Sequence, residues 1–210
     1  MAAILDGKLV RLRPREMTDL ERNLRWINDP EVRRFLLDVR YPVSRPEEEK
    51  WMETSRGLSF QEVRLAIETK EGQHIGNIDL GPASPEHRRA PLGIMIGEKD
   101  CWGRGYGTDA IRTLLRFAFR EMNLERVWLT TGENNARALA CYRKCGFREE
   151  GLLRRDRYLE GRYWDTIVMG ILHEEFDAID GVDAAKGSGP NTSVGVAASR
   201  SGKEAGDAGG

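Results

Sequence analysis

The chain has 210 residues, of which 33 are Lys or Arg and 34 are Asp or Glu, so its formal net charge is −1. A protein that binds nucleic acid by neutralising phosphates needs a clear excess of basic residues, and this balance argues against such a partner. No run approaches the roughly 18 apolar residues of a membrane helix, and residues 1–10 carry no export signal. We expect a cytoplasmic protein with one globular domain and no membrane partner.

The composition changes near Asp180. Residues 181–210 are rich in Gly, Ala and Ser and contain no Leu, Ile, Phe, Tyr or Trp. Such a segment cannot bury enough apolar surface to offset the entropy lost on ordering. We therefore predict a folded domain at residues 5–178 and a disordered tail at residues 179–210.

The first half of the domain alternates between strand and helix patterns. Polar and apolar residues alternate where a strand is expected, and apolar residues recur every three or four positions where a helix is expected. In chain order we predict a strand at 8–13, helices that begin at Thr18-Asp19, Asp29-Pro30 and Arg45-Pro46, a hairpin of strands at 62–68 and 74–80, and a strand at 92–97.

The second half contains the longest amphipathic segment, at residues 105–122. Its apolar residues form one stripe, while Arg112, Arg116 and Arg120 recur on the other side, where we expect solvent. The remaining predicted elements are a strand at 126–131, a helix at 134–144, and strands at 152–158 and 163–172 that flank the turn Glu160-Gly161. The pattern predicts an α+β or mixed α/β fold.

A glycine-rich turn joins the strand at 92–97 to the long helix. It consists of Trp102, Gly103, Arg104, Gly105, Tyr106, Gly107 and Thr108. A turn of this kind exposes backbone N–H groups at the positive end of a helix, which suits a phosphate or pyrophosphate. The P-loop pattern and the dinucleotide pattern G-x-G-x-x-G are both absent. A loop that merely starts a helix is the alternative interpretation.

The helix at 134–144 carries a second group of polar residues. Asn135 and Tyr142 lie seven positions apart and therefore share a face, with Ala138 between them. The phenol of Tyr142 could donate a proton to a departing thiolate, and the small Ala138 leaves room for a ligand chain. Alternatively, Tyr142 is an amphipathic residue at the edge of the core.

Together these segments resemble the GNAT superfamily of acetyl-CoA-dependent N-acetyltransferases. The loop fits the family pattern Q/R-x-x-G-x-G/A except at Trp102, and residues 135–147 (NARALACYRKCGF) are similar to the family segment N-x-x-A-x-x-x-Y-x-K-x-G-F. The similar group includes ribosomal-protein N-terminal-alanine and spermidine acetyltransferases. The resemblance covers residues 8–176 and implies a GNAT-like fold, with a central, twisted, mostly antiparallel sheet of about seven strands flanked by helices.

The resemblance also implies roles for particular residues. The backbones of Met95, Ile96 and Gly97 would bind the pantetheine arm of acetyl-CoA, residues 102–108 would bind its pyrophosphate, and Asn135 would hold the pantetheine side. Tyr142 would be the general acid. Direct attack of an amine on a thioester requires no covalent intermediate, so none of the three cysteines is needed as a nucleophile. Cys141 and Cys145 have no matching His or Cys pair elsewhere, and we expect no metal.

The general base is harder to assign. Relatives often carry a carboxylate at or beside Pro91-Leu92, and this sequence has none there. Asp79 is our candidate, ahead of Glu98 and His87, with relay through water as an alternative. An α-amine, with a pKa of about 7.7 to 8, is deprotonated more easily than a lysine-like amine with a pKa of about 10.4, and so needs a weaker base.

The acceptor is predicted to be a primary amine. Residues 28–56 hold seven acidic and six basic residues, so they offer no acidic funnel for a polyamine. We favour a protein N-terminal α-amine, with a polyamine, an aminoglycoside or an amino sugar as alternatives. A non-catalytic acyl-CoA-binding module and a nucleotide-phosphate-binding protein are the rival functions. A homodimer is the expected oligomer, because dimers are the commonest soluble assemblies.

Overall fold

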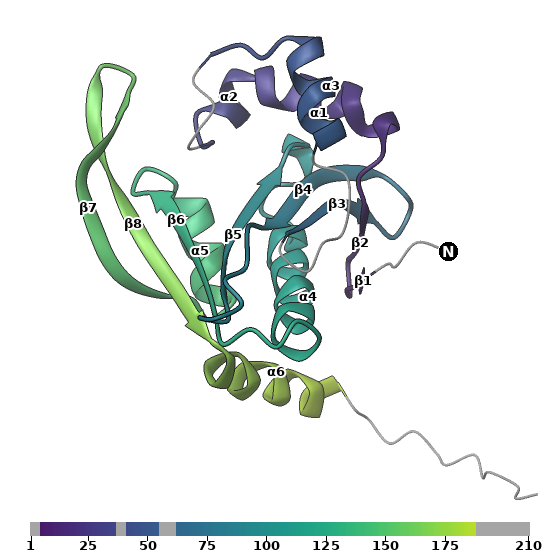
Figure 1. The fold of residues 1–210 in the computed structure, drawn as a ribbon, viewed down its shortest axis with the longest axis vertical. Coiled ribbons are helices and arrows are strands. Elements are labelled where there is room, and N and C mark those ends of the chain that lie inside the picture. The colour runs from purple at the N-terminus through teal and green to yellow at the C-terminus, as the bar shows by residue number, and fades with distance from the viewer. Residues whose placement is uncertain (1–4, 37–40, 55–61, 188–210) are drawn as a thin grey trace, which may run out of the picture.

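The computed structural model describes residues 5–36, 41–54 and 62–187. Within these residues eight strands form one sheet in the order β1-β2-β3-β4-β5-β6-β8-β7 (Figure 1). The strands are β1 (Leu5–Asp6), β2 (Val10–Pro14), β3 (Val63–Thr69), β4 (His74–Leu80), β5 (Arg89–Ile96), β6 (Arg126–Gly132), β7 (Arg148–Leu159) and β8 (Arg162–Leu172). Neighbouring strands are antiparallel except β5 and β6, which run parallel.

The predicted mixed, mostly antiparallel sheet is confirmed, with one strand more than the seven expected. The additional strand is β1, in which Leu5 pairs with Leu12 and Asp6 with Arg11. Two residues are too short to show an alternating pattern in the sequence, and this strand forms because β2 offers it an edge. The predicted turn between β7 and β8 is also confirmed. Glu160 and Gly161 both have positive φ values, of 52° and 82°, as a two-residue hairpin turn requires.

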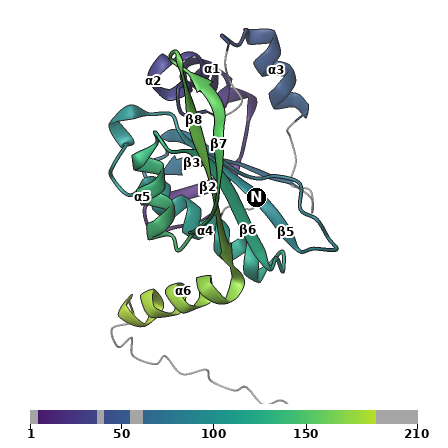
Figure 2. The same cartoon turned by 90° about the vertical axis from the view of Figure 1, so that its left-hand side faces the viewer.

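The helices cover the sheet in separate groups. They are α1 (Leu20–Asn28), α2 (Pro30–Arg33), α3 (Arg45–Thr54), α4 (Tyr106–Arg120), α5 (Ala136–Lys144) and α6 (His173–Gly187). Helices α1 to α3 lie at one end of the molecule and α6 lies at the other (Figures 1 and 2). None of the helices in the described ranges is long and apolar enough to cross a membrane.

Helix α4 packs against the sheet through the apolar stripe that its sequence predicts. Ile111, Leu114 and Leu115 are fully buried, and each such side chain contributes roughly 1.5 to 3 kcal/mol of hydrophobic stabilisation. The first turn is fixed by Asp109, whose carboxylate accepts hydrogen bonds from the backbone N–H groups of residues 8, 9 and 10 at 3.1, 2.6 and 3.0 Å. The start of α4 is therefore held against the start of β2.

Helix α6 corrects the predicted domain boundary. It continues through Gly187, so residues 179–187, which were expected to be disordered, are helical, and residues 188–210 of the expected tail lie outside the described residues. Asp180 is buried, and its carboxylate accepts hydrogen bonds from Arg116 and Arg120 of α4 at 2.8 to 3.0 Å. These two arginines therefore anchor α6 while their side chains stay 32% and 51% exposed, on the helix face where solvent was predicted.

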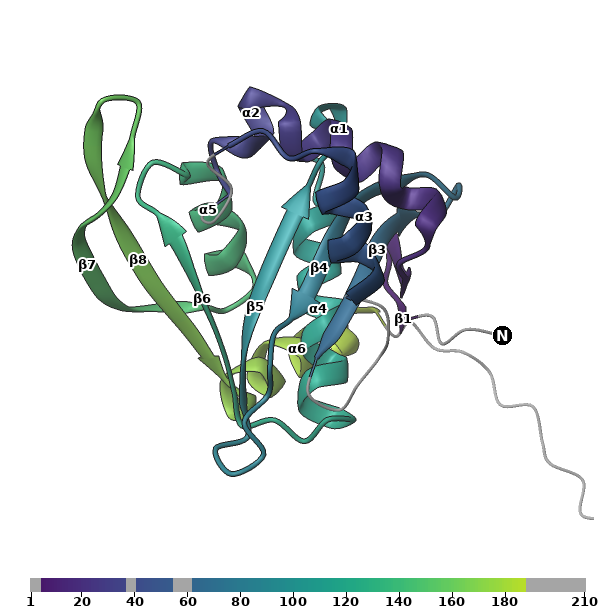
Figure 3. The same ribbon diagram turned by 45° about the horizontal axis from the view of Figure 1, so that its top comes forward.

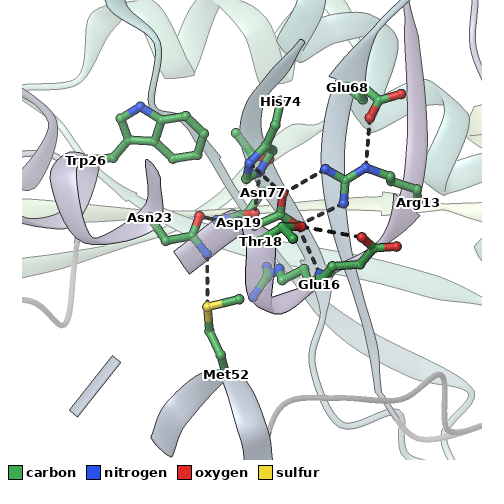
Figure 4. A network of polar contacts seen from close by, with 12 residues as sticks. Arg13, Glu16, Thr18, Asp19, Asn23, Trp26, Met52, Glu68, His74 and Asn77 are labelled. Carbon is green, nitrogen blue, oxygen red and sulfur yellow. Dashed lines mark hydrogen bonds and ion pairs between the residues drawn. The ribbon is translucent and has the colours of Figure 1, made fainter. Parts of the chain in front are cut away.

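A buried polar network joins the start of α1 to β4 (Figure 4). Asp19 accepts two hydrogen bonds of 2.8 Å from the guanidinium of Arg13, and its Oδ1 lies 3.1 Å from Nδ1 of His74. Burial alone would raise the pKa of Asp19, but hydrogen bonds from Arg13 and His74 outweigh it and hold this pKa well below its usual range. Asn77 of β4 donates to Asn23 of α1 at 3.0 Å. The network fixes α1 over the end of the sheet.

Candidate active site

A cavity opens where β5 and β6 separate. In the described part of the chain the two strands pair at residues 89–91 and 126–128 and at no later positions. Beyond this point the strands diverge, with α5 beside the gap (Figure 3). A cavity of about 700 Å³, lined by residues of both strands, extends from here toward α1, α2 and α3. This volume suits a small-molecule ligand.

The hydrogen-bond register of β5 decides which backbone groups face the cavity. Gly97 N–H donates to Ile75 C=O at 2.9 Å, and Gly81 N–H donates to Pro91 C=O at 2.8 Å. Because backbone direction alternates along an antiparallel strand, the odd-numbered positions of β5 face β4. The backbone groups that face the cavity belong to the even-numbered positions Leu92, Ile94 and Ile96.

This register corrects part of the predicted pantetheine site. Of the three β5 positions predicted to bind through their backbones, only Ile96 turns its backbone toward the cavity, and its C=O accepts a hydrogen bond of 2.7 Å from Trp102 Nε1. Met95 lines the cavity with its side chain. Gly97 is absent from the lining, and a Cβ there would lie 2.0 Å from the Trp26 ring. The backbone of Ile94 is the better candidate.

The glycine-rich loop presents backbone N–H groups to the cavity. Gly103 and Gly105 have φ values of 75° and 89°, a left-handed conformation that favours glycine. Gly105 caps α4 without a side-chain hydrogen bond, so the N–H groups of the first turn are left for a ligand. Trp102, Gly103, Gly105, Gly107 and Thr108 line the cavity. The side chains of Arg104 and Tyr106, also predicted to bind the cofactor, do not.

Arg137 is a cavity residue that sequence reasoning missed. Its guanidinium lies 3.7 Å from the centroid of the Trp102 ring and 5.5 Å from that of Phe35. Burial lowers the pKa of Arg137, and Glu31 partly offsets this effect. In the sequence, Arg137 cannot be distinguished from an ordinary solvent-exposed residue of an amphipathic helix. No local pattern therefore indicates that it lines the cavity.

Asn135 and Tyr142 both line the cavity from α5. Asn135 is the N-cap rather than a residue within the helix, and its Oδ1 accepts a hydrogen bond of 3.2 Å from Ala138 N–H. Its amide nitrogen is the group left to donate to a ligand. Tyr142 is 8% exposed and contacts the Phe147 ring edge to face. Burial, reinforced by the neighbouring Cys141 thiol, raises the pKa of Tyr142 above its usual range, so its phenol keeps its proton.

Asp79 lines the same cavity from β4 and forms an ion pair with Arg15. It lies opposite Gly93 of β5, where a Cβ would meet no atom within 4 Å, so the space beside this carboxylate is open. Burial raises the pKa of Asp79, and Arg15 partly offsets this increase. The other base candidates lie outside the lining: Glu98 accepts a hydrogen bond from Trp26, and His87 is exposed.

The sequence of residues 10–148 matches the profile of the family described as acetyltransferase (GNAT) domain. The chain belongs to the GNAT acetyltransferase family. It is accordingly an acetyl-CoA-dependent N-acetyltransferase, and the fold and family expected from the sequence are confirmed. Within the described residues, no group of three or more His, Cys, Asp or Glu side chains is arranged to hold a metal ion.

Individual GNAT proteins are similar over most of this chain. Spermidine N(1)-acetyltransferase of Escherichia coli K12 is 28% identical over 171 residues, which cover 80% of this chain and 88% of the relative. The uncharacterized N-acetyltransferase p20 of Bacillus licheniformis is 27% identical and is covered over 93% of its length. The structure of Vibrio cholerae spermidine N-acetyltransferase in complex with CoA and spermine aligns with a TM-score of 0.74 and 27% identity, covering 81% of this chain and 99% of the relative.

The far end of the GNAT cavity is mainly apolar. It is lined from α1, α2, α3 and the residues that follow α2 by Ile27, Val32, Phe35, Leu36 and Trp51. The charged residues among the described lining are Arg15, Arg137 and Lys144 against Asp79 alone. The cavity is therefore more basic than the nearly neutral chain.

Proposed function

We propose that this acetyltransferase transfers the acetyl group directly to the α-amine of a protein or peptide N-terminus, in a complex that holds both substrates. One observation carries the proposal: the glycine-rich loop, the cavity-facing edge of β5, Tyr142 and Asp79 all line one cavity. A cavity that accepts both reactants supplies proximity and orientation, which suffice for a reaction without a covalent enzyme intermediate.

The cavity fits the coenzyme through backbone groups of α4 and β5 and through the side chains of Arg137 and Asn135. When bound, acetyl-CoA supplies an acetyl group activated as a thioester. The N–H groups at the start of α4 would hold its pyrophosphate, and Arg137 would add a positive charge beside them. The cavity-facing backbone of Ile94 and the amide nitrogen of Asn135 would hold the pantetheine arm.

Tyr142 would act as the general acid. Its raised pKa keeps the phenol protonated at neutral pH, so the hydroxyl can donate a proton as the thiolate leaves. Asp79 would act as the general base and take the proton that the attacking amine gives up. Its own raised pKa makes it a stronger base than an exposed carboxylate, and the open space over Gly93 would place the amine beside it.

The charge of the lining supports an α-amine over a polyamine. A polyamine carries several positive charges, whereas the described lining holds three basic residues and one acidic residue that is already paired with Arg15. An α-amine also has a lower pKa, about 7.7 to 8, so more of it is neutral and able to attack at pH 7. Polyamine acetylation is the second candidate, favoured by the similarity to spermidine acetyltransferases.

The test is the release of free thiol from acetyl-CoA with a panel of peptides, polyamines, aminoglycosides and amino sugars. We expect the highest kcat/KM with peptides that have a free N-terminus, and no reaction with the same peptides after N-terminal acetylation. A higher kcat/KM with spermidine would overturn the α-amine assignment. Coenzyme binding without thiol release for any amine would contradict catalysis altogether.

We further propose a homodimer in the cytoplasm. Cys101, Cys141 and Cys145 are all free thiols, which suits a reducing compartment. Light scattering at several protein concentrations tests the oligomeric state, and a monomer at every concentration would contradict it.

A further inference from the structure

Arg15 is a buried cation whose donors are only partly used. It follows β2, lines the cavity, and its side chain is 5% exposed. Nη2 pairs with Asp79, and Nε lies 3.4 Å from Leu65 C=O. Nη1 is buried and has no hydrogen-bond partner in the described part of the chain. Because a buried charged donor is costly to leave unpaired, such a group in a ligand cavity indicates a partner that arrives with the ligand.

The surroundings hold this guanidinium in one place. The Trp51 ring lies over it, with 5.1 Å between the ring centroid and the guanidinium carbon, and Arg64 lies 5.5 Å from the same ring. Trp51 is 40% exposed, and both Trp51 and Arg15 line the cavity. The positive group is thus fixed beside Asp79, at the open space over Gly93.

We propose that Arg15 determines acceptor specificity by binding the carbonyl oxygen next to the acceptor's amine, while Asp79 receives the amine. The pair then matches an α-amino acyl group, in which an amine and a carbonyl oxygen are separated by a single carbon atom. This inference rests on the proposed function, because it requires the acceptor amine to lie beside Asp79. It narrows the acceptors to peptide N-termini, amino acids and their amides.

Polyamines fail this recognition for two reasons. They contain no oxygen that could accept a hydrogen bond from Nη1, and their second ammonium group would lie near a cation. Where a site is built to hydrogen-bond a substrate group, an analogue that lacks the group leaves a buried donor unpaired and is strongly rejected.

The experiment compares two amines that differ only at the carbonyl. Alaninamide and isopropylamine share a skeleton except that a methyl group replaces the carboxamide, and kcat/KM is expressed per neutral amine because their pKa values differ. Arg15→Met removes the donors and keeps the side-chain length. We expect it to lower the ratio of kcat/KM for alaninamide to kcat/KM for isopropylamine by about 10- to 100-fold, the effect of losing one charged hydrogen bond. Any effect on Asp79, with which Arg15 is paired, is common to both amines and cancels in this ratio.

Arg64→Met is the matched control, because Arg64 is the other cation on Trp51 and lies outside the cavity lining. Arg64→Met should change kcat/KM for both acceptors by the same factor. If Arg15→Met fails to keep the wild-type melting temperature and coenzyme affinity, Arg15→Lys replaces it, since Lys keeps a charge beside Asp79 and loses the fork of donors. The same selective loss is then expected, with a smaller size.

The outcomes separate the two proposals. Equal losses on both amines, or no loss on alaninamide, would overturn the role of Arg15 and leave acetyl transfer intact. Equal kcat/KM values of the wild-type protein for isopropylamine and alaninamide would also overturn the role of Arg15. No thiol release with alaninamide would overturn the Arg15 inference, and no thiol release with the peptides of the acceptor panel either would overturn the proposed function as well.

Discussion

The guanidinium of Arg137 lies against the face of the Trp102 ring, so a cation carried by α5 lies beside the loop that follows β5. Trp102 is held in turn by its hydrogen bond to Ile96 C=O. Trp102 occupies the loop position at which the GNAT pattern has Gln or Arg. The contact therefore brings a guanidinium to the loop from a different element of the fold.

Removing this cation should weaken coenzyme binding. We expect Arg137→Ala to raise the Kd for coenzyme A by about 5- to 20-fold, because a partly exposed charged contact to a phosphate is lost. S-acetylpantetheine, which lacks the phosphates, should bind both proteins within about 2-fold. Isothermal calorimetry measures both ligands, and an equal loss for the two would show that Arg137 acts only by holding Trp102 in place.

Removing the phenol hydroxyl should slow the chemistry and spare binding. Tyr142→Phe keeps the ring contact with Phe147 and loses the proton donor, so kcat should fall by about 10²- to 10⁴-fold while the Kd for coenzyme A stays within about 3-fold. Tyr158→Phe, on the exposed β7–β8 hairpin, is the control and should keep wild-type kcat. Unchanged kcat in Tyr142→Phe would remove Tyr142 from the mechanism.

The dependence of kcat/KM on pH should reflect the ionisation of Asp79. Only the carboxylate can accept a proton, so kcat/KM should rise with pH through the pKa of Asp79, and this rise should lie above the usual range because burial raises that pKa. Asp79→Asn should lower kcat/KM and abolish this limb of the profile. Glu98→Gln, which changes a carboxylate outside the cavity lining, should retain it. If kcat/KM of Asp79→Asn still rose over the same pH range, the proton would instead be relayed through water.

A thiol in the cavity should react at a lower pH than an ordinary cysteine. Hydrogen bonds from Cys145 and Thr108, together with nearby cations, lower the pKa of Cys141 below its usual value despite its burial. Alkylation of Cys141 by iodoacetamide should therefore reach half of its maximal rate at a lower pH than alkylation of a cysteine in an unstructured peptide. Saturating coenzyme A should slow it by about 10-fold or more, while the fully buried Cys145 stays unmodified. Peptide mass spectrometry measures alkylation at each cysteine. If coenzyme A did not change the alkylation rate of Cys141, this residue would lie away from the bound coenzyme.

The α6 anchor should contribute to stability. Asp180→Asn removes the charge that binds Arg116 and Arg120, and because both arginines are partly exposed we expect a loss of about 1 to 2 kcal/mol in the free energy of unfolding. Asp177→Asn, at an exposed position 4.0 Å from Arg120, should cost less than about 0.5 kcal/mol. Urea unfolding tests both variants, and equal losses would contradict a specific anchor.

Periodicity in the sequence predicted those elements that bury one face. Helix α4 is of this kind, as the burial of Ile111, Leu114 and Leu115 illustrates. Periodicity does not reveal which positions of a strand direct their backbones to a given neighbour. That choice depends on pairing with β4, and it moved the predicted backbone contacts from Met95 and Gly97 to Ile94.

Other features arise from contacts between segments distant in sequence. Arg15 follows a short strand in a polar stretch with no pattern of its own, and only the folded sheet brings it to Asp79. The helix beyond residue 178 contradicts its local composition, because Asp180 is fixed by side chains about 60 residues earlier in the chain. Asp79 itself was a candidate because this sequence lacks the carboxylate that relatives carry at or beside Pro91-Leu92, and the open position at Gly93 supports that prediction.

The short parallel pairing of β5 with β6 has a mechanical consequence. In the described part of the chain, a ladder of three residue pairs joins a half-sheet of five strands to a half-sheet of three. Asp79 belongs to the first half, and Tyr142 belongs to the helix that follows β6 in the second. The distance between the proposed proton acceptor and proton donor thus depends on the angle at which the two halves meet. A substitution at Pro91 or Trp128 could alter the rate through that angle while every catalytic side chain remained in place.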